Sequence, residues 1–91
     1  MSNYITQVNP RGLQFDLLEL SPNQTQITLG VKRIVVNHQL YKIMDSWAAW
    51  RNGAYIQVAF RYFDANEREF LMTGITAEEW DILFPSDRGD E

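Results

Sequence analysis

The sequence predicts an α+β domain in which an antiparallel sheet of about five strands carries one long helix and one short C-terminal helix, in the order βββαββα. Three observations predict it. Apolar and polar residues alternate in short runs before residue 37, which indicates strands. From Asn37 the apolar spacing changes to that of a helix. Thr76 and Glu79 then form a capping-box pattern, which indicates the start of a second helix.

Length and composition predict a single compact domain over residues 1–85, followed by a mobile acidic tail over residues 86–91. A hydrophobic content of 45% in 91 residues excludes a disordered chain. No apolar run approaches the length of about 18 residues that a membrane span needs. The first residues show no export signal and the chain lacks cysteine. We therefore expect a cytoplasmic protein without disulfides.

The net charge of −4 is concentrated at the C-terminal end. Residues 1–73 carry seven basic and six acidic groups, whereas residues 74–91 carry six acidic groups and a single arginine. This balance argues against binding to a nucleic-acid backbone, which needs clustered cations. The acidic patch is expected to steer a basic surface of a protein partner, through Glu78, Asp81, Asp87 and Asp90.

The first half of the chain is expected to form strands joined by tight turns. Residues 4–8 lead into Asn9-Pro10-Arg11-Gly12, which has the residue preferences of a type I turn. A second strand covers residues 13–20 and ends at a turn over residues 21–23. The third is expected over residues 25–36, with Gly30 marking a bulge or bend inside it.

A helix is expected over Gln39–Arg51, with Asn37 as its N-cap and Asn52-Gly53 as its stop. Its apolar arc is wider than one core surface needs, so part of it would stay exposed. The alternative continues the preceding strand through Tyr41–Ile43 and leaves only residues 46–51 helical.

The segment from residue 54 to residue 72 is expected to form a β-hairpin that turns at Ala65-Asn66. One face would hold Ile56, Val58, Phe60, Tyr62 and Leu71, and the other would hold Tyr55, Gln57, Ala59, Arg61, Phe63, Arg68, Phe70 and Met72. The last helix would run over Ala77–Phe84 and end at Pro85. The expected core is Leu13, Phe15, Ile27, Ile34, Val36, Leu40, Met44, Trp47, Val58, Phe60, Leu71 and Trp80.

No pattern in the chain predicts catalytic, metal-binding or cofactor-binding residues. His38 is the only histidine, and one imidazole cannot supply both a base and its orienting partner. Asp64-Ala-Asn66 begins like a calcium loop, but Arg68 stands where a ligand is needed. The carboxylates near residue 79 are explained by helix capping. We therefore expect a protein that is not an enzyme.

The expected function is that of a small protein-binding module, an adaptor, inhibitor or chaperone-like protein that covers a partner's surface. Aromatic and arginine side chains on the second hairpin face are typical of protein interfaces. Self-association through this face is a variant, and cation–π stacking of Arg68 on Phe63 and Arg61 on Phe70 is the structural alternative. The expected partner-binding residues are Trp50, Tyr55, Arg61, Phe63, Arg68, Phe70, Glu78 and Asp81.

Two other functions remain open from the sequence. One is a structural subunit or accessory protein of a phage or another large assembly. The second is a small-ligand-binding or catalytic domain with a pocket between the first helix and the sheet, using Tyr41, Tyr55, Arg61 or the Glu78/Glu79 pair.

Overall fold

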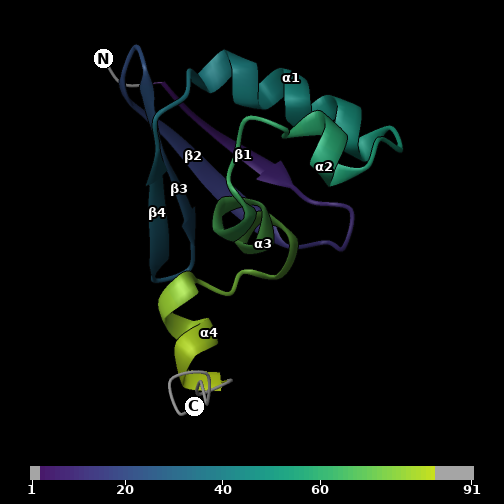
Figure 1. Cartoon of the computed structure of the whole chain (residues 1–91). Helices are drawn as coiled ribbons and strands as arrows, with labels where there is room; N and C mark the ends of the chain where they lie inside the picture. The colour runs from purple at the N-terminus through teal and green to yellow at the C-terminus, as the bar shows by residue number, and fades with distance from the viewer. Residues whose placement is uncertain (1–2, 84–91) are drawn as a thin grey trace.

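Four antiparallel strands pair in chain order, and helices cover one face of the sheet (Figure 1). This computed structural model describes residues 3–83. The strands are β1 (Tyr4–Val8), β2 (Gln14–Ser21), β3 (Gln24–Leu29) and β4 (Lys32–Val36). The helices are α1 (Leu40–Arg51), α2 (Ile56–Ala59), α3 (Ala65–Thr73) and α4 (Ala77–Leu83). The α+β class and the antiparallel sheet are confirmed, but the order is ββββαααα.

The turn between β1 and β2 forms where the sequence places it. The N–H of Gly12 donates to the carbonyl of Asn9 at 2.9 Å, which closes the four-residue turn. The side-chain oxygen of buried Asn9 accepts from the N–H groups of Arg11 and Leu13, both at 2.9 Å. Its Nδ2 donates to the carbonyl of Leu71 at 2.8 Å. One side chain therefore orders the turn and ties it to α3.

The single strand expected over residues 25–36 is wrong, because Gly30 is part of a hairpin turn. Leu29 pairs with Lys32, so only Gly30 and Val31 lie in the loop. Gly30 has φ of 63°, the conformation that a type II′ turn needs at its first central residue. The chain therefore reverses into β4 rather than bending within one strand.

The hairpin expected over residues 54–72 is also wrong, because this segment forms α2 and α3. Asp64 and Glu67 exchange capping-box hydrogen bonds of 2.8 and 3.0 Å, and Gly74 ends α3 with φ of 76°. The solvated hairpin turn expected at Asp64–Glu67 is therefore a helix start. Without these two strands, the sheet has four strands instead of about five.

Helix α1 forms as expected, and the alternative strand over Tyr41–Ile43 does not. Its N-cap is Gln39, which makes no side-chain capping bond. The expected cap, Asn37, instead accepts a hydrogen bond of 3.0 Å from the side chain of Gln24. The cap prediction is therefore wrong, because Asn37 lies two residues before the N-cap and its side chain bonds to Gln24, the first residue of β3.

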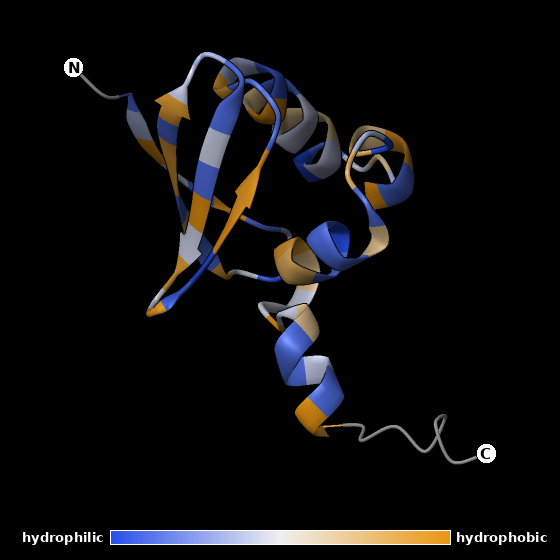
Figure 2. Cartoon of the chain, turned by 60° about the vertical axis from the view of Figure 1, so that its left-hand side comes forward, coloured by the Kyte–Doolittle hydropathy of each residue, from blue (hydrophilic) through white to orange (hydrophobic). Residues whose placement is uncertain are grey.

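Helix α4 begins at the expected capping box, with Thr76 and Glu79 exchanging hydrogen bonds of 2.9 and 3.2 Å. Lys32 of β4 reaches this helix start, where its Nζ lies 3.1 Å from the Glu79 carboxylate and 2.7 Å from the Gly74 carbonyl. The helix then points away from the body of the domain (Figure 2). The expected stop at Pro85 and the tail lie outside the described residues.

The core lies between the inner face of the sheet and helices α1, α2 and α3. The ring of Phe15 meets Trp47 and Phe70 edge-on, with centroids 5.6 and 5.7 Å apart. The buried apolar residues are Phe15, Leu17, Ile27, Val36, Leu40, Ile43, Trp47, Ile56, Phe60, Phe63, Phe70 and Leu71. Leu13, Ile34 and Trp80 are only half-buried.

Two residues placed in the core by the sequence are exposed, namely Met44 and Val58. Strand alternation placed Val58 on the same face as Ile56, but in α2 residues two apart point in nearly opposite directions. Ile56 is buried and Val58 is not. Met44 lies at the margin of the α1 face.

Candidate functional site

The expected partner-binding face does not form, because the structure separates its residues. Phe63 and Phe70 are buried in the core, and Trp50 packs edge-on against Trp47 and Phe60. Tyr55 is 79% exposed at the start of α2, and Arg61 is exposed in the following turn. Glu78 and Asp81 lie on α4, on another part of the molecule.

Arg68 does not stack on an aromatic ring in the expected way. Its Nη1 donates to the carbonyl oxygens of Phe60 and Phe63, in the turn between α2 and α3. This side chain therefore holds the turn that feeds α3. A stabilising contact of this kind leaves Arg68 poorly placed to bind a partner.

A different candidate surface lies along β1, which is an edge strand of the sheet. Asn3 lies opposite Glu19, and the N–H of Glu19 donates to the Asn3 carbonyl at 2.8 Å. Residues in an antiparallel pair alternate in direction, so Tyr4, Thr6 and Val8 turn their main-chain groups away from β2. Within residues 3–83, the outward N–H and C=O of Tyr4 and Thr6 have no hydrogen-bond partner.

Within residues 3–83, the part of this edge at Tyr4 and Thr6 lacks the usual protection against pairing. Edge strands are normally blunted by charges, proline, bulges or a covering element. The other edge strand, β4, carries Lys32 and Arg33. Residues 4–8 have the sequence Tyr-Ile-Thr-Gln-Val, without charge or proline, and pair with β2 in continuous register. β1 is therefore the edge that is open to another strand.

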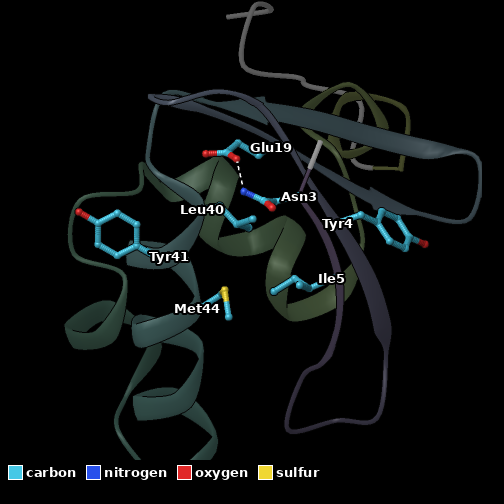
Figure 3. A pocket seen from close by; sticks show the side chains of 7 residues that line it. All are labelled: Asn3, Tyr4, Ile5, Glu19, Leu40, Tyr41 and Met44. Carbon is cyan, nitrogen blue, oxygen red and sulfur yellow. Dashed lines mark hydrogen bonds between the residues drawn. The ribbon is translucent and has the colours of Figure 1, made fainter. Parts of the chain in front are cut away.

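A groove of about 290 Å³ opens between β1 and the start of α1 (Figure 3). The side chains of Ile5, Leu40 and Met44 point into the space between the strand and the helix, while the ring of Tyr4 points to the opposite side of the strand. The lining residues are Asn3, Tyr4, Ile5, Glu19, Leu40, Tyr41 and Met44.

Two exposed tyrosines flank this groove, since Tyr4 is 60% and Tyr41 is 64% exposed. Tyr41 is one of the residues expected in a helix–sheet pocket, but Tyr55, Arg61, Glu78 and Glu79 do not line the groove. Apolar side chains and an exposed main chain lie next to each other here. Such an arrangement suits an extended protein segment.

At its opposite end, the edge of β1 is closed by two side chains of α1. The indole Nε1 of Trp47 and the guanidinium of Arg51 donate to the carbonyl oxygen of Val8, at 3.0 and 3.2 Å. Leu40 lies beside the start of the strand, so α1 runs in the same direction as β1 along this edge. The opening therefore lies at the Tyr4 end.

The two ends of this edge differ in charge. At the open end Asn3 donates a side-chain hydrogen bond to Glu19, and no cation among the described residues lies within ion-pairing distance of that carboxylate. At the closed end stands Arg51, with Arg11 in the turn that follows β1. An acidic end and a basic end are thus joined by an uncharged strand.

Searches of protein families, curated proteins and solved structures found no match for the chain. The candidate site therefore rests on its own geometry.

A second polar cluster surrounds Tyr62, beneath the start of α1. Its hydroxyl lies 2.7 Å from Ser46 Oγ and donates to the Lys42 carbonyl at 3.1 Å, and the ammonium of Lys42 sits over its ring. Burial raises the pKa of Tyr62, with Asp45 adding to it. The hydrogen bond from Ser46 acts in the opposite direction and lowers this pKa. His38 stacks on Phe63 nearby. The contacts of the Tyr62 hydroxyl join α1 to the α2–α3 turn.

The structure offers no arrangement for a metal within the part of the chain it describes, because no three histidine or acidic side chains there converge. No helix in residues 3–83 is both long enough and apolar enough to cross a bilayer. A further hollow of about 220 Å³ separates β4 from α3 and α4. It is bordered by Asp64 and Glu67, whose side chains are used in capping.

Sequence reasoning missed the β1 edge, although two signals for it were present. Consecutive hairpins place the first strand at one edge of an antiparallel sheet. Residues 4–8 are also the predicted strand without a charged side chain. What could not be read from the sequence is that α1 stands back from this edge and leaves a groove beside it.

Proposed function

We propose that this chain is a protein-binding module without catalytic activity, and that it binds through the edge of β1 and the groove beside it. This β1 edge surface consists of the outward main-chain groups of Tyr4 and Thr6 with the side chains of Ile5, Tyr41 and Met44. The observation that carries the proposal is the unpaired, uncharged edge next to an open apolar groove.

The chemistry of the groove favours binding over catalysis. Its carboxylate, Glu19, already accepts a hydrogen bond from Asn3. The remaining lining is apolar or phenolic, so the groove offers contact area and main-chain hydrogen bonds. A partner strand would gain affinity from the main chain of β1 and specificity from a side chain placed in the groove.

Replacing Thr6 by proline tests the surface directly. The N–H of Thr6 faces outward, so Thr6→Pro removes an edge donor and keeps every β1–β2 main-chain bond. Thr6→Ala is the matched control, because it loses the same side-chain bond to Asp16 and retains the N–H. Wild type and each variant serve as bait in an extract of the cells that produce the protein naturally, and the bound proteins are identified by mass spectrometry.

Wild type and Thr6→Ala are expected to retain the same partner, and Thr6→Pro is expected to lose it. Circular dichroism must show that all three baits are folded. If the three folded baits retain identical proteins, the β1 edge is not the binding surface.

A further inference from the structure

We propose that the partner bound at the β1 edge surface is a second copy of this chain, in a twofold dimer whose β1 strands pair antiparallel near Ile5. This inference rests on the proposed function, because it uses the same surface and names the occupant. It is carried by the main-chain, charge and side-chain patterns along the edge, each of which is self-complementary.

The main-chain groups match when the twofold axis passes near Ile5. Tyr4 then lies opposite Thr6 of the partner subunit, and Thr6 lies opposite the partner subunit's Tyr4. These residues turn their N–H and C=O groups outward and lack partners within residues 3–83. Two such pairs form four hydrogen bonds, the repeating unit of an antiparallel ladder. The Val8 carbonyl, already bonded to α1, is not needed.

The charges match in the same arrangement. Antiparallel pairing brings the acidic end of one edge, at Glu19, to the basic end of the other, at Arg51 of the partner subunit. Within one chain these ends are separated by about 16 Å along β1, from a strand rise of about 3.3 Å per residue. That separation exceeds the Debye length of about 8 Å at physiological ionic strength. The attraction is therefore mainly between copies.

Helix α1 supplies a matching side-chain stripe. Tyr41, Met44 and Ala48 are exposed and are spaced three and four residues apart, so they lie on one face of the helix. Because α1 runs in the direction of β1, the twofold axis places the two α1 helices antiparallel. Tyr41 then lies near the partner's Ala48, and Met44 lies near its own symmetry copy. A large side chain thus meets a small one, as close helix packing favours.

Helix α4, the described helix of the acidic segment, does not oppose this dimer. Helix α4 follows β4, the strand at the other edge of the sheet, where Lys32 contacts its first turn. Figure 1 shows α4 at the end of the molecule opposite α1. In the dimer the two acidic helices therefore lie on the outer sides, and the joined sheet is twice the four-stranded sheet.

The first test is the mass of the purified protein, measured by light scattering and sedimentation over a wide concentration range. Wild type and Thr6→Ala are expected to approach twice the chain mass of 10.7 kDa. The dissociation constant of the Thr6→Pro dimer is expected to be roughly 10- to 100-fold higher than that of wild type, because the substitution removes two inter-chain hydrogen bonds per dimer. A folded wild type that stays monomeric throughout overturns the dimer.

The second test reverses the charges at the two ends of the edge. Glu19→Lys and Arg51→Glu are each expected to weaken the dimer about tenfold, and the double variant is expected to recover most of that loss. Raising the salt concentration should shrink the difference between single and double variants. A dimer unaffected by these changes and by Thr6→Pro forms through another surface, which also overturns the proposal.

The two proposals fail in different ways. In one outcome the protein is monomeric, the wild-type and Thr6→Ala baits retain another protein, and the Thr6→Pro bait does not retain it. The dimer is then overturned, and the proposal of a binding module stands. If mass and bait experiments are both insensitive to Thr6→Pro, both proposals are overturned.

Discussion

The indole Nε1 of Trp47 donates a 3.0 Å hydrogen bond to the carbonyl oxygen of Val8. This bond joins the largest buried side chain of α1 to the last residue of the edge strand. Arg51 donates to the same oxygen from the outside. α1 thereby satisfies one outward carbonyl of β1 and leaves the groups of Tyr4 and Thr6 open.

Trp47→Phe is expected to lower the free energy of unfolding by about 1–3 kcal/mol, because it removes the hydrogen bond to Val8 and part of a filled core site. Trp50→Phe is the control, since half-buried Trp50 makes ring contacts without a comparable main-chain bond. Urea unfolding followed by circular dichroism measures both. An equal or larger loss for Trp50→Phe would contradict the assigned role of Trp47.

Asn9→Ala is expected to cost on the order of 2–4 kcal/mol, because the buried side chain bonds main-chain groups of both its own turn and α3. Asn9→Asp keeps the acceptor for Arg11 and Leu13, and only its protonated form has an O–H that can replace the donor to Leu71. It should therefore fall between wild type and Asn9→Ala at a pH where the new carboxyl is neutral. Equal stability of Asn9→Ala and wild type would show that the turn orders itself without this side chain.

The start of α3 depends on Asp64. Asp64→Ala is expected to cost about 1 kcal/mol, the usual value for losing an N-cap acceptor, whereas Asp64→Asn should cost less because its oxygen can still accept from Glu67. Thermal or urea unfolding of the pair separates capping from other effects of the substitution. If both variants lose the same stability, charge rather than the cap is what stabilises this helix start.

Acidification is expected to weaken the attachment of α4 through Glu79. The Thr76 N–H, and then Lys32, hold the pKa of Glu79 below its ordinary value of 4.5. A lowered folded-state pKa gives stability that is fully present above 4.5 and is lost as pH falls through the folded value. Melting temperatures between neutral and acidic pH should therefore decline less steeply for Glu79→Gln.

Glu78→Gln is the control for this pH dependence, because Glu78 is a neighbouring carboxylate in the same helical turn. It should retain the wild-type decline. A Glu79→Gln profile parallel to wild type would mean that the Thr76 and Lys32 contacts do not distinguish the two protonation states.

Local sequence patterns determined two features of the fold, the turn between β1 and β2 and the start of α4. Asn9-Pro-Arg-Gly12 fixes its turn because its side-chain and main-chain bonds form within five residues. The capping box at Thr76 likewise depends on residues three apart. Contacts this short in sequence can be read without the rest of the fold, and both were predicted correctly.

Residues 54–72 were decided by tertiary structure. Their apolar residues alternate like a strand, yet Ile56, Phe60, Phe63 and Phe70 also recur at helical spacing. The Asp64–Glu67 pair fits a helix cap as well as a turn. Packing against the sheet favours helices over a hairpin in this segment. The inner face of the sheet around Phe15 is covered by the rings of Phe70 and Trp47, and both rings come from helices.

The candidate site shows the same division. Residues 4–8 alone predict an uncharged strand at the end of a sheet, which is local information. Whether that edge is covered depends on the position of α1. The hydrogen bond between Trp47 and Val8, which are 39 positions apart in the chain, fixes that position. The sequence by itself determined an uncharged first strand, and only the packing of α1 decided that the edge of this strand stays open with a groove beside it.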